Sequence, residues 1–200
     1  MRPKEGKNMK KSLKIMMLSG LFAAALLFMS AAAVGQKAAD FTLPGSDDKS
    51  HSLSSYADGN GIVLIFVSTR CPVSNAYNER FNALAADYKA KGITVLGINS
   101  NRTEKMAGSK KHATKNGLTF PVLKDAGNKV ADNFEASVTP EVVLLDKSLT
   151  IRYLGRIDDS QKAAHVKRSD LRDAIDAILA GSAIGETKTN AFGCSIKRER

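Results

Sequence analysis

Apolar and polar positions along the chain form alternating blocks that predict strands and helices in turn. Unbroken apolar runs, typical of strands buried on both faces, occur at 61–67 and 93–98. Shorter runs predict further strands at 39–44, 120–123, 141–145 and 150–154. Apolar residues at helical spacing predict a long helix over 72–91, and further helices are expected over 103–116, 128–134 and 169–180. Strands that alternate with helices and then close with a hairpin and a helix predict an α/β sandwich around a mixed sheet.

The N-terminal segment has the order of a secretory signal peptide. Basic residues up to Lys14 precede an apolar run over 15–29, and three small residues follow at 31–33. We expect cleavage close to residue 35 and a mature protein that is periplasmic or secreted. The alternative is an uncleaved membrane anchor, because the apolar stretch reaches about 20 residues, which suffices to span a bilayer. Either arrangement places the domain outside the cytoplasm, where disulfides persist.

Charge and composition exclude several classes of function. The formal net charge is +10, but half of this excess lies in residues 1–33. The remaining body is nearly balanced and lacks the aromatic and basic face that binds single-stranded nucleic acid, so we expect no nucleic-acid partner. The three histidines have no metal-ligand spacing to one another or to the cysteines, and no phosphate-binding glycine loop occurs. We therefore expect neither a metal nor an organic cofactor.

Cys71 lies between a predicted buried strand and the first turn of a predicted helix. Pro72 suits the first helical position, where its missing N–H needs no partner. A helix N-terminus favours an anion by up to about 2 kcal/mol, so this position favours the reactive thiolate. Arg70 adds a neighbouring positive charge, unless its side chain points to solvent. The alternative for Cys71 is an inert, buried thiol.

These features carry a family resemblance. The strand–turn–Cys–helix unit, followed much later by Thr139-Pro140, resembles the thioredoxin-like superfamily, and more closely its redoxin group, related to alkyl hydroperoxide reductase and thiol-specific antioxidant. The similarity runs from Lys37 to Lys197. The motifs that carry it lie at 39–43, 71–77, 97–101, 139–146, 153–159 and 192–194.

The resemblance implies a thioredoxin-like three-layer sandwich, in which helices flank a central mixed β-sheet. We accordingly expect a signal peptide over 1–35, the redoxin domain over 36–186 and a C-terminal tail over 187–200. Cys71 matches the nucleophilic position of the thioredoxin Cys-x-x-Cys pair, but Ser74 replaces the second cysteine. Pro140 matches the cis-proline of the superfamily, whose loop lies against the active-site sulfur.

The peroxiredoxin pattern is matched only in part. Ser68 occupies its hydroxyl position three residues before Cys71, whereas Leu64 stands where the pattern has proline. The arginine that helps to polarise peroxide in that family has no clear counterpart. Arg70 and Arg156 are candidates to substitute for it. Peroxide reduction is thus one expected activity and disulfide reduction the other.

Cys194 is the second of two cysteines. It is a candidate resolving cysteine, which would release a sulfenic acid or mixed disulfide formed on Cys71. Two alternatives are a permanent structural bridge to Cys71 and a bridge between two subunits of a homodimer. The adjoining Phe192-Gly193 and the polar tail favour a mobile segment, which suits the resolving role.

The sequence thus indicates an exported thiol oxidoreductase, a peroxiredoxin-like antioxidant, with Cys71 as nucleophile. Its substrates are expected to be peroxides or protein disulfides, and an unidentified thiol would serve as electron donor. The alternative is a binding module that keeps the fold without turnover and holds a partner protein or a soft metal ion through Cys71. The absence of a local second cysteine at Ser74 favours that alternative.

Overall fold

A computed structural model describes Met1 and residues 33–199 of the chain. The predicted signal peptide lies almost wholly outside the described residues. Within 33–199, no helix combines the length and the apolar character needed to cross a membrane.

The fold is built on a five-stranded mixed sheet with the strand order β5-β4-β3-β7-β8. Strands β3, β4 and β5 run parallel, and β7 and β8 continue the sheet in antiparallel pairing. The bounds are Gly61–Phe66 for β3, Ile93–Asn99 for β4, Val122–Lys124 for β5, Glu141–Asp146 for β7 and Ile151–Gly155 for β8. The expected buried strands and the hairpin are therefore present.

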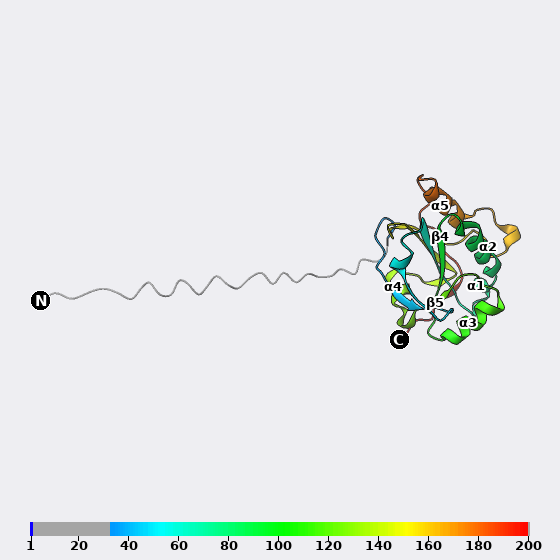
Figure 1. The fold of residues 1–200 in the computed structure, drawn as a ribbon, viewed down its shortest axis with the longest axis horizontal. Helices are drawn as coiled ribbons and strands as arrows, with labels where there is room; N and C mark the ends of the chain where they lie inside the picture. Colours follow the sequence, from blue (N-terminus) through cyan, green and yellow to red (C-terminus); the bar gives the residue numbers. More distant parts are fainter. Residues whose placement is uncertain (2–32, 200) are drawn as a thin grey trace. The chain divides into compact units, whose positions relative to one another are not determined.

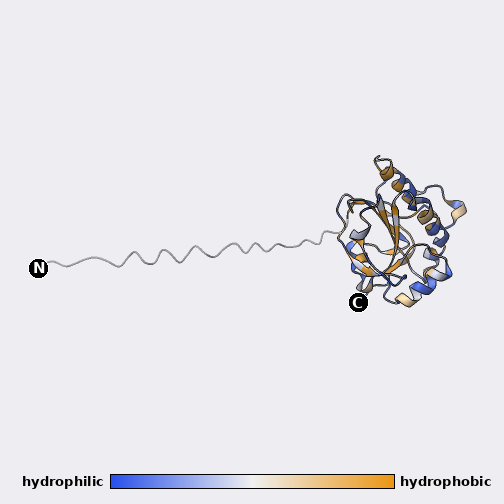
Figure 2. Cartoon of the chain, in the orientation of Figure 1, coloured by the Kyte–Doolittle hydropathy of each residue, from blue (hydrophilic) through white to orange (hydrophobic). Residues whose placement is uncertain are grey.

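Helices cover both faces of this sheet (Figure 1). On one face, α2 (Asn78–Lys89) and α5 (Asp170–Leu179) pack on the sheet, and on the other lie α4 (Lys129–Asn133) and the 3-10 turn η1 (Leu53–Tyr56). This three-layer arrangement confirms the fold class expected from the sequence, and the apolar residues concentrate on the central strands (Figure 2).

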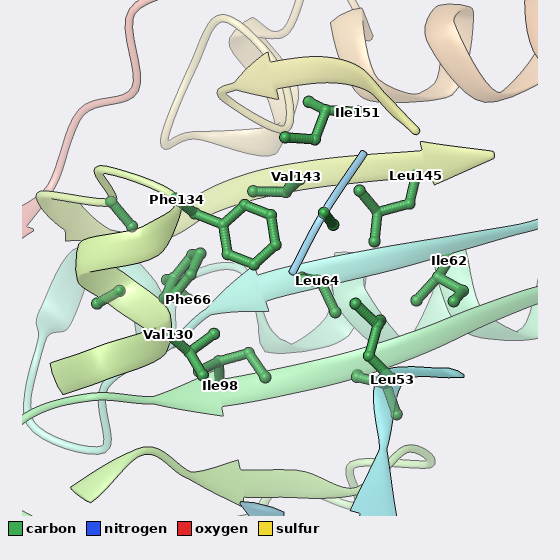
Figure 3. Close-up of a cluster of buried hydrophobic side chains, with 14 of the residues drawn as sticks. Leu53, Ile62, Leu64, Phe66, Ile98, Val130, Phe134, Val143, Leu145 and Ile151 are labelled. Carbon is green, nitrogen blue, oxygen red and sulfur yellow. The ribbon is translucent and has the colours of Figure 1, made fainter. Parts of the chain in front are cut away.

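Strand β3 supplies both halves of the core. Ile62, Leu64 and Phe66 join the cluster that contains Phe134, whereas Val63 and Ile65 join the cluster on the opposite face. Figure 3 shows the first of these clusters. All five side chains are fully buried, and each contributes about 1.5–3 kcal/mol by leaving water. The unbroken apolar run is thus explained by burial on two faces.

Smaller elements complete the chain. Strands β1 (Thr42–Pro44) and β2 (Ser50–Ser52) form a hairpin, and β6 (Val138–Thr139) pairs with β9 (Cys194–Ser195). The remaining helical segments are α1 (Pro72–Asn75), α3 (Met106–Lys115), η2 (Ala126–Asn128) and η3 (Ala163–His165).

Two predicted helices differ in extent from the expectation. The helix predicted over 72–91 is divided into α1 and α2, because the N–H of Tyr77 turns back to the carbonyl of Ser74, a tighter i→i+3 bond. The helix predicted over 103–116 begins only at Met106. Its expected first turn instead carries Glu104 into the interior, where that residue is 4% exposed.

Candidate active site

Cys71 lies at the end of the turn that joins β3 to α1. Cys71 is the N-cap of α1 with Pro72 directly after it, as the sequence predicted, and its side chain is buried. The N–H of Ser74 donates a hydrogen bond to the Cys71 Sγ at 3.3 Å. Because α1 spans only 4 residues, its dipole is much smaller than that of the long helix predicted here. The local N–H contact therefore matters more to this sulfur than the helix as a whole.

The loop that carries Pro140 lies against the same sulfur. The peptide bond between Thr139 and Pro140 is cis, the geometry expected from the resemblance. In the thiol form, the Cys71 Sγ donates to the carbonyl oxygen of Thr139 at 3.2 Å. The Glu141 carboxylate accepts hydrogen bonds from the backbone N–H groups of Ser137 and Val138 at 2.7 and 3.2 Å. Glu141 therefore fixes the approach to this loop.

Strand pairing brings Cys194 to the same place. In the ladder between β6 and β9, Cys194 is the partner of Thr139. The two cysteines are free thiols whose side chains are hydrogen-bonded to each other, although 122 residues separate them in the sequence. The N–H of Val73 also bonds to the Cys194 sulfur. Both cysteines predicted as site residues thus meet at one point.

The contact between the thiols separates their acidities. Burial raises the pKa of the Cys71 thiol, but hydrogen bonds from Cys194, from Ser74 N–H and from Thr139 outweigh burial and hold that pKa below its ordinary value. The pKa of Cys194 is raised, first by its hydrogen bond to Cys71 and then by burial. Cys71 is therefore the more acidic of the two thiols, and when it ionises the Cys194 thiol is the group that stabilises its anion.

The Phe192-Gly193-Cys194 motif is explained by a close approach of backbones. We define the C-terminal strap as residues 192–199. A Cβ atom at position 193 would overlap the carbonyl oxygen of Thr139, so only glycine lets the strap pass this close. The Phe192 ring packs against the Tyr77 ring, with the centroids 6.5 Å apart. These contacts fix the segment that precedes Cys194.

The strap is tied down on both sides, which differs from the mobile tail expected from its polarity. The N–H of Ile196 donates to the carbonyl of Ser137 at 2.9 Å, and the Ile196 side chain is buried. On the other side, the Arg102 N–H donates to the carbonyl of Lys197 at 2.8 Å. The Lys197 N–H in turn donates to the Asn101 Oδ1 at 2.9 Å. Backbone pairing therefore holds the strap in register.

Ser68 and Arg70 occupy roles other than those expected. The Ser68 Oγ accepts hydrogen bonds from the N–H groups of Arg70 and Cys71, both at 3.1 Å, and has no hydrogen bond to the sulfur. The Arg70 side chain is exposed, and no described residue forms an ion pair with it. Arg156, the other arginine considered, is paired with Asp170 at 2.7 Å. Leu64 lies inside β3, between β4 and β7.

Glu104 is the site residue that the sequence did not reveal. Its carboxylate accepts hydrogen bonds from Ser68 Oγ, Thr69 N–H, Thr69 Oγ1 and Asn99 Nδ2, at distances of 2.6, 2.7, 2.9 and 2.8 Å. Burial raises the pKa of Glu104, but these donors outweigh it, and the pKa lies below its usual value. The only signal in the sequence was an acid in a polar segment after a buried strand, which is far from specific.

The described residues give no sign of a metal centre. Within 33–199, no group of three or more His, Cys, Asp or Glu side chains is placed to hold a metal ion. Asp158, which directly precedes Asp159, is buried, and its carboxylate accepts hydrogen bonds from Tyr77 and Arg80 at 2.9 and 2.6 Å.

Comparison with known proteins gives a consistent set of likenesses. The model of the AhpC/TSA family matches residues 34–154. The thiol-disulfide oxidoreductase ResA of Geobacillus kaustophilus is 31% identical over 125 residues, which make up 62% of this chain and 70% of that protein. A Mycobacterium tuberculosis protein named as a candidate peroxiredoxin is 32% identical over 96 residues, 48% of this chain and 59% of that protein.

Solved structures agree with these matches. An uncharacterised conserved protein from Geobacillus kaustophilus superposes with a TM-score of 0.78 at 30% identity, covering 84% of this chain and 93% of that one. The likenesses confirm the resemblance and the thioredoxin-like fold expected from the sequence. The names of the relatives confirm the expected class of enzyme, a thiol oxidoreductase.

Proposed function

The chain belongs to the AhpC/TSA family, and from that premise we propose that it is an exported thiol-disulfide oxidoreductase in which Cys71 attacks a protein disulfide and Cys194 resolves the product. The observation that carries the proposal is the meeting of the two cysteines at Thr139, which pairs with Cys194 and whose carbonyl oxygen accepts from the Cys71 sulfur. A second thiol at this point supplies what the missing local cysteine, replaced by Ser74, would supply in a Cys-x-x-Cys protein.

The reaction balances with these two groups. The Cys71 thiolate attacks one sulfur of the substrate disulfide, the substrate S–S bond breaks, and the departing thiolate takes up a proton. The Cys194 thiolate then attacks the Cys71 sulfur of the mixed disulfide and releases the second substrate thiol. The substrate gains two electrons and two protons, and the enzyme is left with a Cys71–Cys194 disulfide. An external thiol reductant must reduce that bridge before the next cycle.

The pKa shifts of the two thiols support Cys71 as the attacking cysteine and Cys194 as the resolving cysteine. The lowered pKa of Cys71 favours the nucleophile needed for the first attack. The pKa of Cys194 is raised chiefly by its hydrogen bond to Cys71. Once Cys71 is bound in a mixed disulfide, it no longer accepts that proton, so the main cause of the raised pKa is removed. Cys194 therefore becomes easier to deprotonate at the step where its thiolate is required.

The surroundings of Cys71 favour disulfides over peroxides as substrates. Peroxiredoxin chemistry places a hydroxyl and an arginine beside the reactive sulfur. Here the Ser68 hydroxyl is taken up by two backbone N–H groups and Glu104. Among the described residues, no guanidinium is hydrogen-bonded to the Cys71 sulfur, and Leu64 belongs to the central strand. Export is supported by the signal-like order of residues 1–33.

The proposal is tested by mass mapping of wild type and of the variants Cys71→Ser and Cys194→Ser. Reduced protein is mixed with a peptide disulfide and, separately, with hydrogen peroxide. We expect wild type to reduce the peptide and to acquire a Cys71–Cys194 bridge within one chain. Cys194→Ser should retain the peptide as a mixed disulfide on Cys71, and Cys71→Ser should do neither.

Other outcomes would contradict the proposal in distinguishable ways. Turnover of peroxide without turnover of the peptide would assign a peroxidase. A bridge that spans two chains on a non-reducing gel would move resolution to a homodimer. A bridge that resists thiol reductants in the folded protein would indicate a structural link. Stable capture of the peptide by wild type, without release, would favour a binding module.

A further inference from the structure

Glu104 reaches the active-site turn from a distant part of the chain. It is almost fully buried in the segment between β4 and α3, and its carboxylate lies under the turn that leads to Cys71. Three of its four hydrogen bonds come from Ser68 and Thr69, and the fourth comes from the Asn99 amide. A buried carboxylate with this many donors is held as an anion. The turn before Cys71 is therefore built on a fixed negative charge.

The Ser68 hydroxyl passes this constraint on to Cys71. A hydroxyl has one proton to donate and two lone pairs that accept. Here the proton goes to the Glu104 Oε1 at 2.6 Å, and the lone pairs accept the N–H groups of Arg70 and Cys71. Every bonding position of this hydroxyl is occupied. Its orientation follows from the acceptor at Glu104, because a proton directed there leaves both lone pairs free for the backbone.

Ser68 also fixes the other side of the sulfur. Its N–H donates to the Ser74 Oγ at 3.3 Å, and the Ser74 N–H donates to the Cys71 Sγ at 3.3 Å. The same residue thus holds the backbone of Cys71 through its hydroxyl and contacts, through its amide, the residue that donates to the sulfur. A loosened Ser68 would disturb both the position of Cys71 and its nearest backbone donor.

We propose that Glu104 is a positioning residue for Cys71, which acts through the Ser68 hydroxyl to hold the nucleophile at the start of α1. The role deepens the proposed function, on which its catalytic meaning rests. Glu104 touches neither the sulfur nor any atom that reacts. Its charge is also felt by His112 and Lys124, which face it at longer range, and the Lys124 Nζ donates to the carbonyls of Asn99 and Asn101.

A carboxylate is needed in this place rather than any polar group of the same shape. In Glu104→Gln, an amide nitrogen facing Ser68 would donate to an oxygen that already accepts two hydrogen bonds, and the Ser68 proton would lose its acceptor. If the amide oxygen faced Ser68 instead, the nitrogen would confront Thr69 and Asn99, which donate to that side. In either orientation at least one buried donor faces another donor or has no acceptor, and this raises the free energy of the folded state.

The test measures the acidity of Cys71 in a Cys194→Ala background, where one thiol titrates. The ultraviolet absorbance of the thiolate is followed against pH, and the rate of reaction with a small aromatic disulfide is measured on the same samples. For Ser68→Ala, which keeps the charge of Glu104, we expect the pKa of Cys71 to rise by about one unit, which is about tenfold less thiolate at neutral pH. Glu104→Gln should raise the pKa of Cys71 by less, because removing a nearby negative charge by itself favours the thiolate. The matched control is Thr69→Val, which removes another hydrogen bond to the same carboxylate and leaves Ser68 intact.

A raised pKa in Glu104→Gln and Ser68→Ala, with little change in Thr69→Val, supports the role. An unchanged pKa of Cys71 in folded Ser68→Ala, or an equal rise in Thr69→Val, overturns it in favour of a purely structural carboxylate. If Glu104→Gln does not fold, Ser68→Ala decides by the same criterion. The titration needs no physiological substrate, so a failure of the proposed disulfide turnover would leave this result independently readable.

Discussion

Cys194 is the ladder partner of Thr139, the residue whose carbonyl oxygen lies 3.2 Å from the sulfur of Cys71. Strand pairing therefore places the second thiol beside Cys71, whereas in a Cys-x-x-Cys protein the helix that begins at the first cysteine carries the second. The cis-proline loop contacts both cysteines, because Thr139 pairs with Cys194 in the ladder and its carbonyl oxygen accepts from the Cys71 sulfur. The proposed redox pair thus depends on three segments that are far apart in the sequence.

The contact between the thiols predicts a reciprocal effect on their titrations. Replacing Cys194 with Ala should raise the pKa of Cys71, because its anion loses a hydrogen-bond donor. Replacing Cys71 with Ala should lower the pKa of Cys194, because the main cause of its upward shift is removed. Thiolate absorbance in wild type should therefore show two steps that lie farther apart than the pKa values of the single-cysteine variants. Coincident values would mean that the thiols do not interact.

The close approach of Gly193 to the Thr139 carbonyl predicts a selective defect in the step in which Cys194 attacks Cys71 and closes the bridge. In Gly193→Ala the added methyl group would overlap the Thr139 carbonyl and push the strap away, at a cost of about 1–3 kcal/mol in unfolding free energy. We expect slower formation of the Cys71–Cys194 bridge, measured by quenched alkylation and mass spectrometry. The control is Gly185→Ala, where an added Cβ meets nothing within 4 Å. Bridge formation at the wild-type rate in Gly193→Ala would contradict the placement of the strap.

Glu104 predicts a pH-dependent part of the stability. Its pKa is lowered by folding, so the unfolded chain binds the proton more readily, and ionisation favours the folded state. This contribution is complete above the pKa of an unfolded glutamate, about 4.3, and is lost as the pH falls through the lower pKa of the folded state. Urea unfolding should therefore show a gap between wild type and Glu104→Gln that narrows at acidic pH. A gap that stays constant or widens there would argue against an ionised Glu104.

Two tyrosines offer a matched comparison of buried and exposed hydrogen bonds. The Tyr77 hydroxyl donates to the buried Asp158 at 2.9 Å, and the Tyr88 hydroxyl donates to the exposed Asp176 at 3.0 Å. Tyr77→Phe should cost about 1–2 kcal/mol of unfolding free energy, because a buried carboxylate loses a donor. Tyr88→Phe should cost less, since water replaces the lost group. Equal losses in chemical denaturation would mean that Asp158 is better solvated than its burial indicates.

The sequence predicted those parts of the fold that local patterns encode. The apolar runs of β3 and β4 and the β7–β8 hairpin lie where they were expected, because burial on both faces leaves a continuous apolar signature. The break at Tyr77 was missed, since the apolar spacing continues through it. Strands β6 and β9 are two residues long and carry no periodic pattern.

In the candidate site, too, the residues marked by a local motif were predicted and those placed by tertiary contacts were not. Cys71 and Pro140 were found because a motif marks each position. The partnership of Glu104 with Ser68 was not, since 36 positions separate them and either residue alone is unremarkable on a polar loop. Ser68 was selected because it matches the hydroxyl position of the peroxiredoxin pattern, and its hydroxyl accepts from the backbone N–H groups of Arg70 and Cys71. Side-chain direction depends on tertiary packing, which a single sequence does not display.

The position of β3 in the centre of the sheet indicates which segment must adjust when the Cys71–Cys194 bridge forms. Cys71 follows a strand that is paired along its whole length on both sides, with β4 and with β7. Its sulfur therefore follows a segment that is held by hydrogen bonds along both edges. A disulfide requires the sulfurs to approach to about 2.05 Å, and the β9 pairing that carries Cys194 is only two residues long. Closing the bridge therefore requires the short β6–β9 pairing to adjust, since β3 is paired along both edges and holds the approach to Cys71 in place.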